Sequence, residues 1–327
     1  MKIRFGIVGT NSISDWFLGG AMMDERFELS AVYSRAMEKG REFAAKYNVE
    51  RVYTTFEEMS EWVDAVYIAS PNSCHADQSL FFLKRGIHVL CEKAFCSNAR
   101  EAVEMIAAAK KSGAVLMEAM ISTVNPNFIK LRDSIHRVGR VRKYAATYCQ
   151  YSSRYNKLKD GIVENAFKRE FSNGALMDIG VYTIYPMVVL FGRPKSIRAT
   201  GHILGTGVDG SGAALFEYDG MDAIISYSKI SDSFGSSEIQ GEEGALIIDK
   251  ISNPRKLWFK TKSLEEDLSV TDFKDDYYYE VKEFIDLIEE GKIEHEINSH
   301  ENSLIVMEIM DEIRRQAGVI FPADTTP

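Results

Sequence analysis

The chain has 327 residues and a mass of 36.9 kDa, which at about 150 residues per domain corresponds to two domains. Hydrophobic residues make up 45% and charged residues 27%, which excludes a disordered, collagen-like or coiled-coil chain. The 39 basic and 48 acidic residues give a net charge of 39 − 48 = −9, which disfavours a general nucleic-acid-binding protein. No apolar run approaches the roughly 20 residues that cross a bilayer, and the amino terminus has no apolar signal-peptide stretch. The sequence therefore predicts a cytoplasmic protein without nucleic-acid or membrane partners and with reduced cysteines.

The first 120 residues alternate short apolar runs with helical patterns. Capping-box spacing at Ser12–Asp15 and Thr55–Glu58 marks two helix starts, and Gly86 marks a helix end. The predicted strands are Ile3–Val8, Phe27–Tyr33, Asp64–Ala69, Ile87–Glu92 and Ala114–Ala119. Strand–helix alternation of this kind predicts a doubly wound parallel sheet, so residues 1–120 are expected to form an α/β domain.

After Ala119 the pattern changes to strand runs with few helices between them. Asp219-Gly220 is a short-loop hairpin signal between two of these runs. The predicted strands are Val141–Ser152, Ile197–Ile203, Ala213–Tyr218, Ala223–Ser228, Ala245–Asp249 and Lys256–Phe259. Helices are predicted from Asn125-Pro126, over Gly174–Phe191, over Tyr279–Ile288 and over residues 299–315, the last packing back on the body. Residues 121–327 are therefore expected to form an α+β domain with an open-faced, mainly antiparallel sheet.

The turn after the first strand is the first candidate site. A dinucleotide fingerprint has glycine at three positions. Here only the first is glycine, Gly9, while Asn11 and Ser14 occupy the second and third. The helix that follows would present free N–H groups to a phosphate. The residues predicted to bind the dinucleotide here are Gly9, Thr10, Asn11, Ser12 and Ile13. The alternative is an ordinary strand–helix turn.

The end of the second strand predicts the choice of cofactor. An acidic residue there would bind a ribose 2′-hydroxyl, but this chain has Ser34-Arg35. A hydroxyl beside a guanidinium suits a phosphate, which favours NADP(H) over NAD(H). The alternative is an Arg35 that only stacks on adenine.

Two further motifs carry groups that can move a proton. Lys93 follows Glu92 at the carboxyl end of a strand, where open α/β sheets bind ligands. Asp178 and Tyr182 lie four apart on a predicted helix and share one face. Gly180 between them weakens the helix by about 1 kcal/mol, which suggests a close approach to the backbone. The alternatives are a solvated Glu-Lys turn and a core tyrosine.

Together these features resemble the Gfo/Idh/MocA family of oxidoreductases over essentially the whole chain, closest to the dimeric dihydrodiol dehydrogenase and glucose–fructose oxidoreductase branch. The motifs in the family's order are Gly6 to Gly9, Ser70-Pro71-Asn72 with His75, Glu92-Lys93, Met117-Glu118-Ala119 and Gly174 to Tyr182. The resemblance implies a Rossmann domain, cofactor contacts that include Ser70, Pro71, Asn72, His75 and Glu92, and a sheet that pairs into a homodimer or homotetramer. This chain departs from the family at Ala94, where proline is usual, and in its depleted glycine turn.

The implied activity is hydride transfer between a nicotinamide and a carbinol or carbonyl of a sugar, polyol or cyclic diol. Tyr182 is the expected acid and base, and a neighbouring Lys93 ammonium would favour its ionised form and stabilise charge on the substrate oxygen. Asp178 would orient Lys93 or bind a hydroxyl. The residues predicted to bind substrate are Glu118, Arg154, Asn165, Asp178 and Tyr182, with Tyr151 and Tyr155 as further candidates.

Other classes stay open. The fold also hosts nucleotide- and sugar-binding regulators without turnover, although such proteins need no proton donor. Another branch uses tightly held NAD to cleave glycosidic bonds, and this reaction would show no net change in nicotinamide. A metal hydrolase is disfavoured because the six histidines are scattered and no ligand cluster is present, so no metal is predicted.

Overall fold

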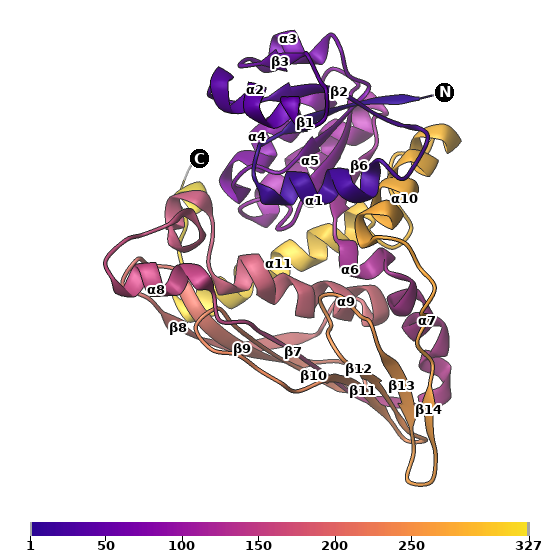
Figure 1. The fold of residues 1–327 in the computed structure, drawn as a ribbon. Helices are drawn as coiled ribbons and strands as arrows, with labels where there is room; N and C mark the ends of the chain where they lie inside the picture. The colour runs from indigo at the N-terminus through magenta and orange to yellow at the C-terminus, as the bar shows by residue number, and fades with distance from the viewer. Residues whose placement is uncertain (1, 326–327) are drawn as a thin grey trace. The chain divides into compact units, whose positions relative to one another are not determined.

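The computed structural model describes residues 2–325 (Figure 1). The chain divides into two compact units, Met1–Ile121 with Lys274–Ser303 and Ser122–Phe273 with Leu304–Pro327. The sequence placed residues 274–303 in the second domain, whereas here they group with the first unit. The two units are therefore described separately.

The first unit is built on a six-stranded parallel sheet with the order β3-β2-β1-β4-β5-β6. Its strands are β1 (Ile3–Val8), β2 (Phe27–Tyr33), β3 (Val52–Tyr53), β4 (Ala65–Ile68), β5 (His88–Glu92) and β6 (Leu116–Ala119). Its connecting helices are α1 (Ser12–Ala21), α2 (Met37–Ala45), α3 (Phe56–Ser60), α4 (Asn72–Leu83) and α5 (Ala99–Ser112). This arrangement confirms the doubly wound sheet. Only β3 has no counterpart among the predicted strands, because two residues carry no periodicity.

Local helix signals act as expected at α3 but not at α1. The Thr55 side chain accepts the N–H of Glu58, and its hydroxyl donates to the Glu58 carboxylate at 2.7 Å. The capping box predicted at Ser12 is wrong, because Asn11 is the N-cap and accepts the N–H groups of Ile13 and Ser14. Asn is as good an N-cap as Ser, so the helix begins in the fingerprint turn itself.

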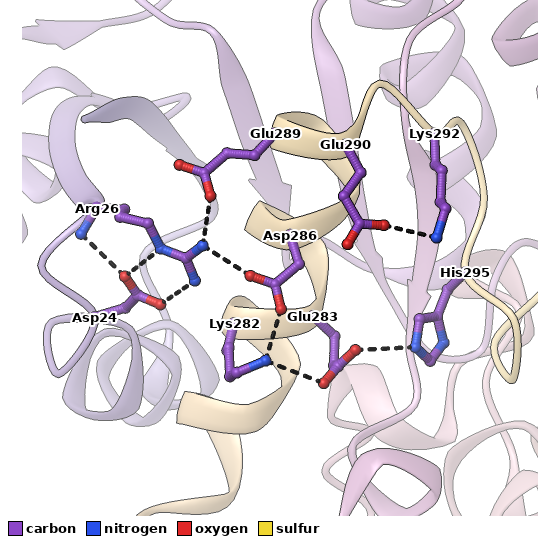
Figure 2. Close-up of polar contacts among 9 residues, drawn as sticks. All are labelled: Asp24, Arg26, Lys282, Glu283, Asp286, Glu289, Glu290, Lys292 and His295. Carbon is purple, nitrogen blue, oxygen red and sulfur yellow. Dashed lines mark hydrogen bonds and ion pairs between the residues drawn. The ribbon is translucent and has the colours of Figure 1, made fainter. Parts of the chain in front are cut away.

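Helix α10 (Asp276–Glu290) explains why a late segment belongs to the first unit. Figure 2 shows Arg26 bound to Asp24 beside it and, at 2.7 Å each, to Asp286 and Glu289 of α10. On α1, a Cβ at Gly20 would lie 2.6 Å from the backbone nitrogen of Tyr278. Helix α10 thus packs against α1 at Gly20, where a larger residue would collide with its backbone, and the Arg26 guanidinium ties α10 to the sheet unit by ion pairs.

The second unit is built on an eight-stranded sheet with the order β14-β13-β12-β11-β7-β10-β9-β8. Its strands are β7 (Val141–Cys149), β8 (Ser196–Ile203), β9 (Asp209–Glu217), β10 (Asp222–Ser228), β11 (Ser237–Gly241), β12 (Ala245–Ile248), β13 (Leu257–Lys260) and β14 (Glu265–Asp267). Only β7 and β10 pair in parallel, so the mainly antiparallel sheet is confirmed. The polar strands β11 and β14 had no apolar run to reveal them.

Helix α9 (Val181–Phe191) lies along one face of this sheet, over β7 and β10 (Figure 1). The remaining helices are α6 (Ile121–Val124), α7 (Pro126–Ser134), α8 (Ser153–Lys159) and α11 (His300–Ala317). At the end of α11, Gln316 accepts the N–H of Ala199 and donates to the carbonyl of Ile197, both on β8. The stretch Arg169–Phe191 is long and apolar enough to cross a membrane by length and composition, but its most apolar window is 72% buried, as in a core helix.

Candidate active site

The first unit gathers the predicted cofactor residues at the carboxyl edge of its sheet. Val8 pairs with Ile68 across the ladder, and Ile68 pairs with Cys91. Because parallel strands end together, the residues that follow β1, β4 and β5 emerge at one edge. The glycine turn, the Ser70 loop and Lys93 are therefore neighbouring features of this edge.

The fingerprint turn keeps a tight geometry with one glycine. Gly9 has φ 115°, and a Cβ there would lie 2.7 Å from the carbonyl oxygen of Ala69. The Asn11 amide donates to that same oxygen at 2.8 Å, and the Ser14 hydroxyl donates to the Gly9 carbonyl at 2.9 Å. Asn11 and Ser14 thus tie the turn to β4 and to itself, where other fingerprints rely on glycine.

This turn fits a phosphate. The Asn11 side chain accepts the N–H groups of Ile13 and Ser14. Among the residues that the structure describes, the N–H groups of Asn11 and Ser12 have no protein acceptor. Both side chains are exposed at the amino end of α1. Orphan N–H groups and the helix dipole together favour an anion there. Thr10 and Ile13 flank them half-buried.

The end of β2 supplies the second cofactor contact. Ser34 is buried, and its hydroxyl accepts the N–H of Ala36 at 3.3 Å. Arg35 is exposed beside it. The guanidinium, rather than the Ser34 hydroxyl, is therefore the group that can reach a 2′-phosphate.

His75 joins two loops of this edge. The imidazole is fully buried on α4, with Nδ1 2.9 Å from the carbonyl oxygen of Ala94 and Nε2 2.9 Å from that of Ser70. Burial lowers the pKa of His75, while the two carbonyls oppose that shift. Pro71 precedes α4 as its N-cap, and Asn72 is buried in its first turn. His75 therefore braces the loop after β5 against the loop after β4.

Glu92 anchors the loop that carries Lys93. Its carboxylate is buried, accepts the Tyr67 hydroxyl, and accepts the N–H of Lys93 at 3.2 Å. Phe17 stacks on the Tyr67 ring with centroids 3.6 Å apart. The Lys93–Ala94 peptide is cis. Glu92 thus holds the backbone of Lys93, and the Lys93 side chain is half-buried.

Glu118 lies on β6 and is only 1% exposed. Burial raises the pKa of its carboxyl to about 8, although the Ser303 hydroxyl and the backbone of Phe95 oppose the shift. Burial therefore favours the protonated form of Glu118 at neutral pH. Its assignment as a substrate contact stays a prediction.

In the second unit, Asp178 lies on a π-helical turn, Leu176–Gly180, that leads into α9. Gly174 lies two residues before this turn, and a Cβ there would lie 2.1 Å from the carboxylate of Asp209. Asp209 accepts the N–H of Leu176 at 2.8 Å, and burial raises its pKa to about 6. The close approach expected at Gly180 is real, because a Cβ there would lie 3.1 Å from the Tyr227 ring. Such π-turns are frequent at functional sites.

Asp178 makes an ion pair with Lys229, which directly follows β10. The Lys229 side chain is 4% exposed and Asp178 is 36% exposed. Tyr182 lies one turn further along, and its ring packs edge-on against Tyr148 with centroids 5.7 Å apart. Sequence reasoning singled out Asp178 and Tyr182, whose roles stay predictions, but not Lys229 or Asp209. One signal was available, because Lys229 ends an apolar strand as Lys93 does.

The other predicted substrate residues lie on exposed segments of the second unit. Arg154 on α8 is 3.6 Å from Glu164, and Asn165 follows that glutamate in a short 3₁₀ turn. Tyr151 donates to Asn156, and Tyr155 packs against Phe167. Within residues 2–325, no group of three or more His, Cys, Asp or Glu side chains could hold a metal ion.

A doubly wound parallel sheet whose first helix end fits a phosphate, followed by a mainly antiparallel sheet domain, is the architecture expected of an NAD(P)-dependent oxidoreductase. Residues 3–120 match the model of the oxidoreductase family with an NAD-binding Rossmann fold, and residues 128–247 match the GFO/IDH/MocA C-terminal domain. The chain belongs to the Gfo/Idh/MocA family and is an NAD(P)-dependent dehydrogenase of its sugar and polyol group.

Relatives with full-length matches confirm the expected branch. The chain is 50% identical to scyllo-inositol 2-dehydrogenase (NADP(+)) IolU of Bacillus subtilis (strain 168), covering 98% of this chain and 99% of that one. It is 29% identical to the trans-1,2-dihydrobenzene-1,2-diol dehydrogenase of Danio rerio, covering 99% and 100%. The fold is similar to aldose-aldose oxidoreductase from Caulobacter crescentus complexed with glycerol, with a TM-score of 0.85, 21% identity, and coverage of 97% and 98%.

Proposed function

We propose that this enzyme is an NADP(H)-preferring dehydrogenase of a cyclic polyol of the inositol class. The observation that carries the proposal is the placement of Asp178, a carboxylate that is 36% exposed, one turn before Tyr182. A polyol needs an acceptor for one hydroxyl and a proton partner for the hydroxyl that reacts. The 50% identical relative named a scyllo-inositol 2-dehydrogenase (NADP(+)) supports this substrate class.

In the proposed mechanism, NADP(H) held by the first unit would supply the hydride chemistry of its nicotinamide. The Tyr182 phenol exchanges a proton with the substrate oxygen. The Lys93 ammonium stabilises negative charge on that oxygen and favours the ionised phenol. Asp178 accepts a hydrogen bond from a neighbouring substrate hydroxyl. The turn from Gly9 to Ile13 would hold the pyrophosphate, and the loops at Ser70 and Glu92 would hold the nicotinamide end.

The activity test is a panel of inositols, sugars and cyclic diols offered with NADP⁺ or NAD⁺, followed by the absorbance of reduced nicotinamide. Reduction of NADP⁺ with an inositol, and with simple sugars only weakly, is the expected result. Silence across the panel with both cofactors would refute the proposal and favour a regulatory protein. Product formed without net nicotinamide reduction would instead favour a glycosidase with tightly bound NAD.

Arg35 supports the preference for NADP(H), because it is the exposed cation at the end of β2 where no acidic residue is present. Arg35→Gln should lower kcat/KM for NADP⁺ by about tenfold or more, the value of one charge-assisted contact, and leave NAD⁺ nearly unchanged. Lys84→Gln is the matched control, because Lys84 is exposed at the carboxyl end of α4, away from the site. Equal loss with both cofactors would contradict a phosphate contact.

The open face of the eight-stranded sheet is the proposed subunit interface of a homodimer or homotetramer. Leu215 and Ile224 lie directly opposite each other on β9 and β10 and are 45% and 46% exposed. Leu215→Asp should shift the native mass toward the monomer, whereas Val103→Asp on exposed α5 should not. A native mass unchanged by Leu215→Asp would count against this face. Cytoplasmic location stays a prediction.

A further inference from the structure

Lys229 is a buried lysine that the family motif does not include. Its side chain is 4% exposed, and its ammonium lies 5.1 Å from the centre of the Phe167 ring. Burying an ammonium is costly unless a partner stabilises its charge. Here the ammonium is stabilised by an ion pair with Asp178 and by the face of the Phe167 ring.

The Lys229 backbone is held from both sides. Its N–H donates to the Gly210 carbonyl at 2.8 Å, and its carbonyl accepts the N–H of Ser152 at 2.9 Å. Phe167, which covers the ammonium, is fully buried in a small core with Ala166 and Val208. The ammonium therefore has a fixed position before any substrate binds.

Asp178 is the more exposed partner in this pair, since it is 36% exposed and lies on a π-turn. Asp209 holds the start of that turn through the Leu176 N–H and is the second carboxyl near the Lys229 ammonium. One carboxyl thus fixes the backbone of the turn, and the ammonium fixes the carboxylate it presents. Asp178 keeps 36% of its side chain exposed while it is paired with Lys229, so a substrate hydroxyl can reach the carboxylate that the ammonium orients.

We infer that Lys229 is a positioning residue that orients the Asp178 carboxylate for a substrate hydroxyl next to the reacting carbon. The inference rests on the proposed function and deepens it, because it assigns the second hydroxyl of a polyol to a preorganised acceptor. A preorganised acceptor binds the substrate without the cost of ordering its side chain. Asp178 therefore contributes to substrate affinity more than to the chemical step.

The kinetic test uses Lys229→Met, which keeps the length of the side chain and removes its charge. KM for the polyol should rise about tenfold or more, while kcat should change less than about threefold. The dissociation constant of NADPH should stay the same. This pattern is expected when an interaction that binds the substrate and the transition state equally is lost. Lys229→Arg should recover part of the lost affinity. Lys195→Met is the matched control, because Lys195 pairs with Asp219 on the surface of the same unit and should leave both constants unchanged.

A double-variant cycle tests the pathway through Asp178. Adding Lys229→Met to Asp178→Asn should raise KM no further, because the carboxylate that the ammonium orients is already gone. Thermal unfolding gives a readout without substrate. Asp178→Asn removes the ion-pair partner of the buried Lys229 ammonium and leaves the Asp209 carboxyl near it. This single variant should therefore have the lowest melting temperature of the cycle, and the double variant with Lys229→Met should have a higher one.

The outcomes separate the two proposals. Wild-type KM in Lys229→Met, or effects of the two substitutions that add, would overturn the positioning role while the polyol dehydrogenase stands. A wild-type enzyme that is silent on the polyol panel would refute the proposed function, and the positioning role with it, even if the melting cycle reveals the ion pair. A fall in kcat and a matching loss of NADPH affinity in Lys229→Met would show a purely structural role.

Discussion

Glu118 should make a contribution to the stability of the enzyme that decreases as pH rises. The carboxyl is buried on β6, and burial raises its pKa from 4.5 to about 8. The folded protein therefore holds a proton that the unfolded chain releases near its ordinary pKa. Between these two values the folded state binds more protons, so the free energy of unfolding decreases with increasing pH. Glu118→Gln removes this dependence, because an amide stays neutral throughout.

The size of the effect follows from the pKa difference. The shift is 8 − 4.5 = 3.5 units, and at about 1.4 kcal/mol per unit it corresponds to about 5 kcal/mol in total. Most of this change falls between about pH 5 and about pH 8.5. Over that range the free energy of unfolding of the wild type should decrease by about 4 kcal/mol relative to that of the variant. At low pH both forms are neutral and should be similar in stability.

Urea unfolding of both proteins across this pH range measures the difference. Two of the three tryptophans, Trp16 and Trp62, lie in the first unit and report on it by fluorescence. The gap in unfolding free energy between Glu118→Gln and the wild type should widen with pH. Glu104→Gln, an exposed change on α5, should keep a constant gap. A constant gap for Glu118→Gln as well would mean that Glu118 is ionised in the folded state, which would refute the reasoning.

Three further substitutions test other parts of the structure. Gly9→Ala places a Cβ 2.7 Å from the Ala69 carbonyl oxygen at φ 115°, so it should lower the free energy of unfolding by about 2 to 3 kcal/mol and weaken dinucleotide binding. The control Gly19→Ala, on α1 with nothing within 4 Å of the added Cβ, should stabilise the protein slightly. Equal melting temperatures for the two variants would contradict this reasoning. Arg26→Met removes the ion pairs of the guanidinium with buried Asp24 and with Asp286 and Glu289 of α10. The free energy of unfolding of the first unit, measured in urea, should therefore fall by about 1 to 3 kcal/mol. An unchanged midpoint would show that α10 is held by packing alone. Lys93→Met should lower kcat by about a hundredfold or more with NADPH affinity nearly kept, and wild-type turnover on a confirmed substrate would rule out the role proposed for Lys93.

The strands of the first unit could be predicted because each is a short apolar run bounded by turn residues. The same rule failed where a strand owes its place to neighbours rather than to its own composition. β11 and β14 are polar and pair through their backbones, and β3 is two residues long. The grouping of α10 with the first unit depends on Arg26, some 260 residues away in sequence, so no local pattern contains it.

The fingerprint turn shows a different kind of gap. The sequence identified the turn at Gly9 but assigned the cap to Ser12, because the capping-box spacing was present. The structure gives the cap to Asn11, whose amide also donates to the Ala69 carbonyl just after the neighbouring strand β4. One side chain therefore replaces a glycine, begins the helix and joins two loops. Only the position of β4 reveals the third role, and that position is a tertiary fact.

Two lysines follow apolar strands in this chain, and the sequence singled out only one. Lys93 stands in a motif, while Lys229 stands where a solvated lysine would be expected after a strand. What separates them is burial, and the burial of Lys229 comes from Phe167, Gly210 and Asp178, which are distant from it in sequence. Groups that exchange protons with a substrate are restricted to a few residue types, so a pattern can reveal them. Groups that orient those residues can be of almost any polar type, so they can be recognised only from their contacts in the folded chain.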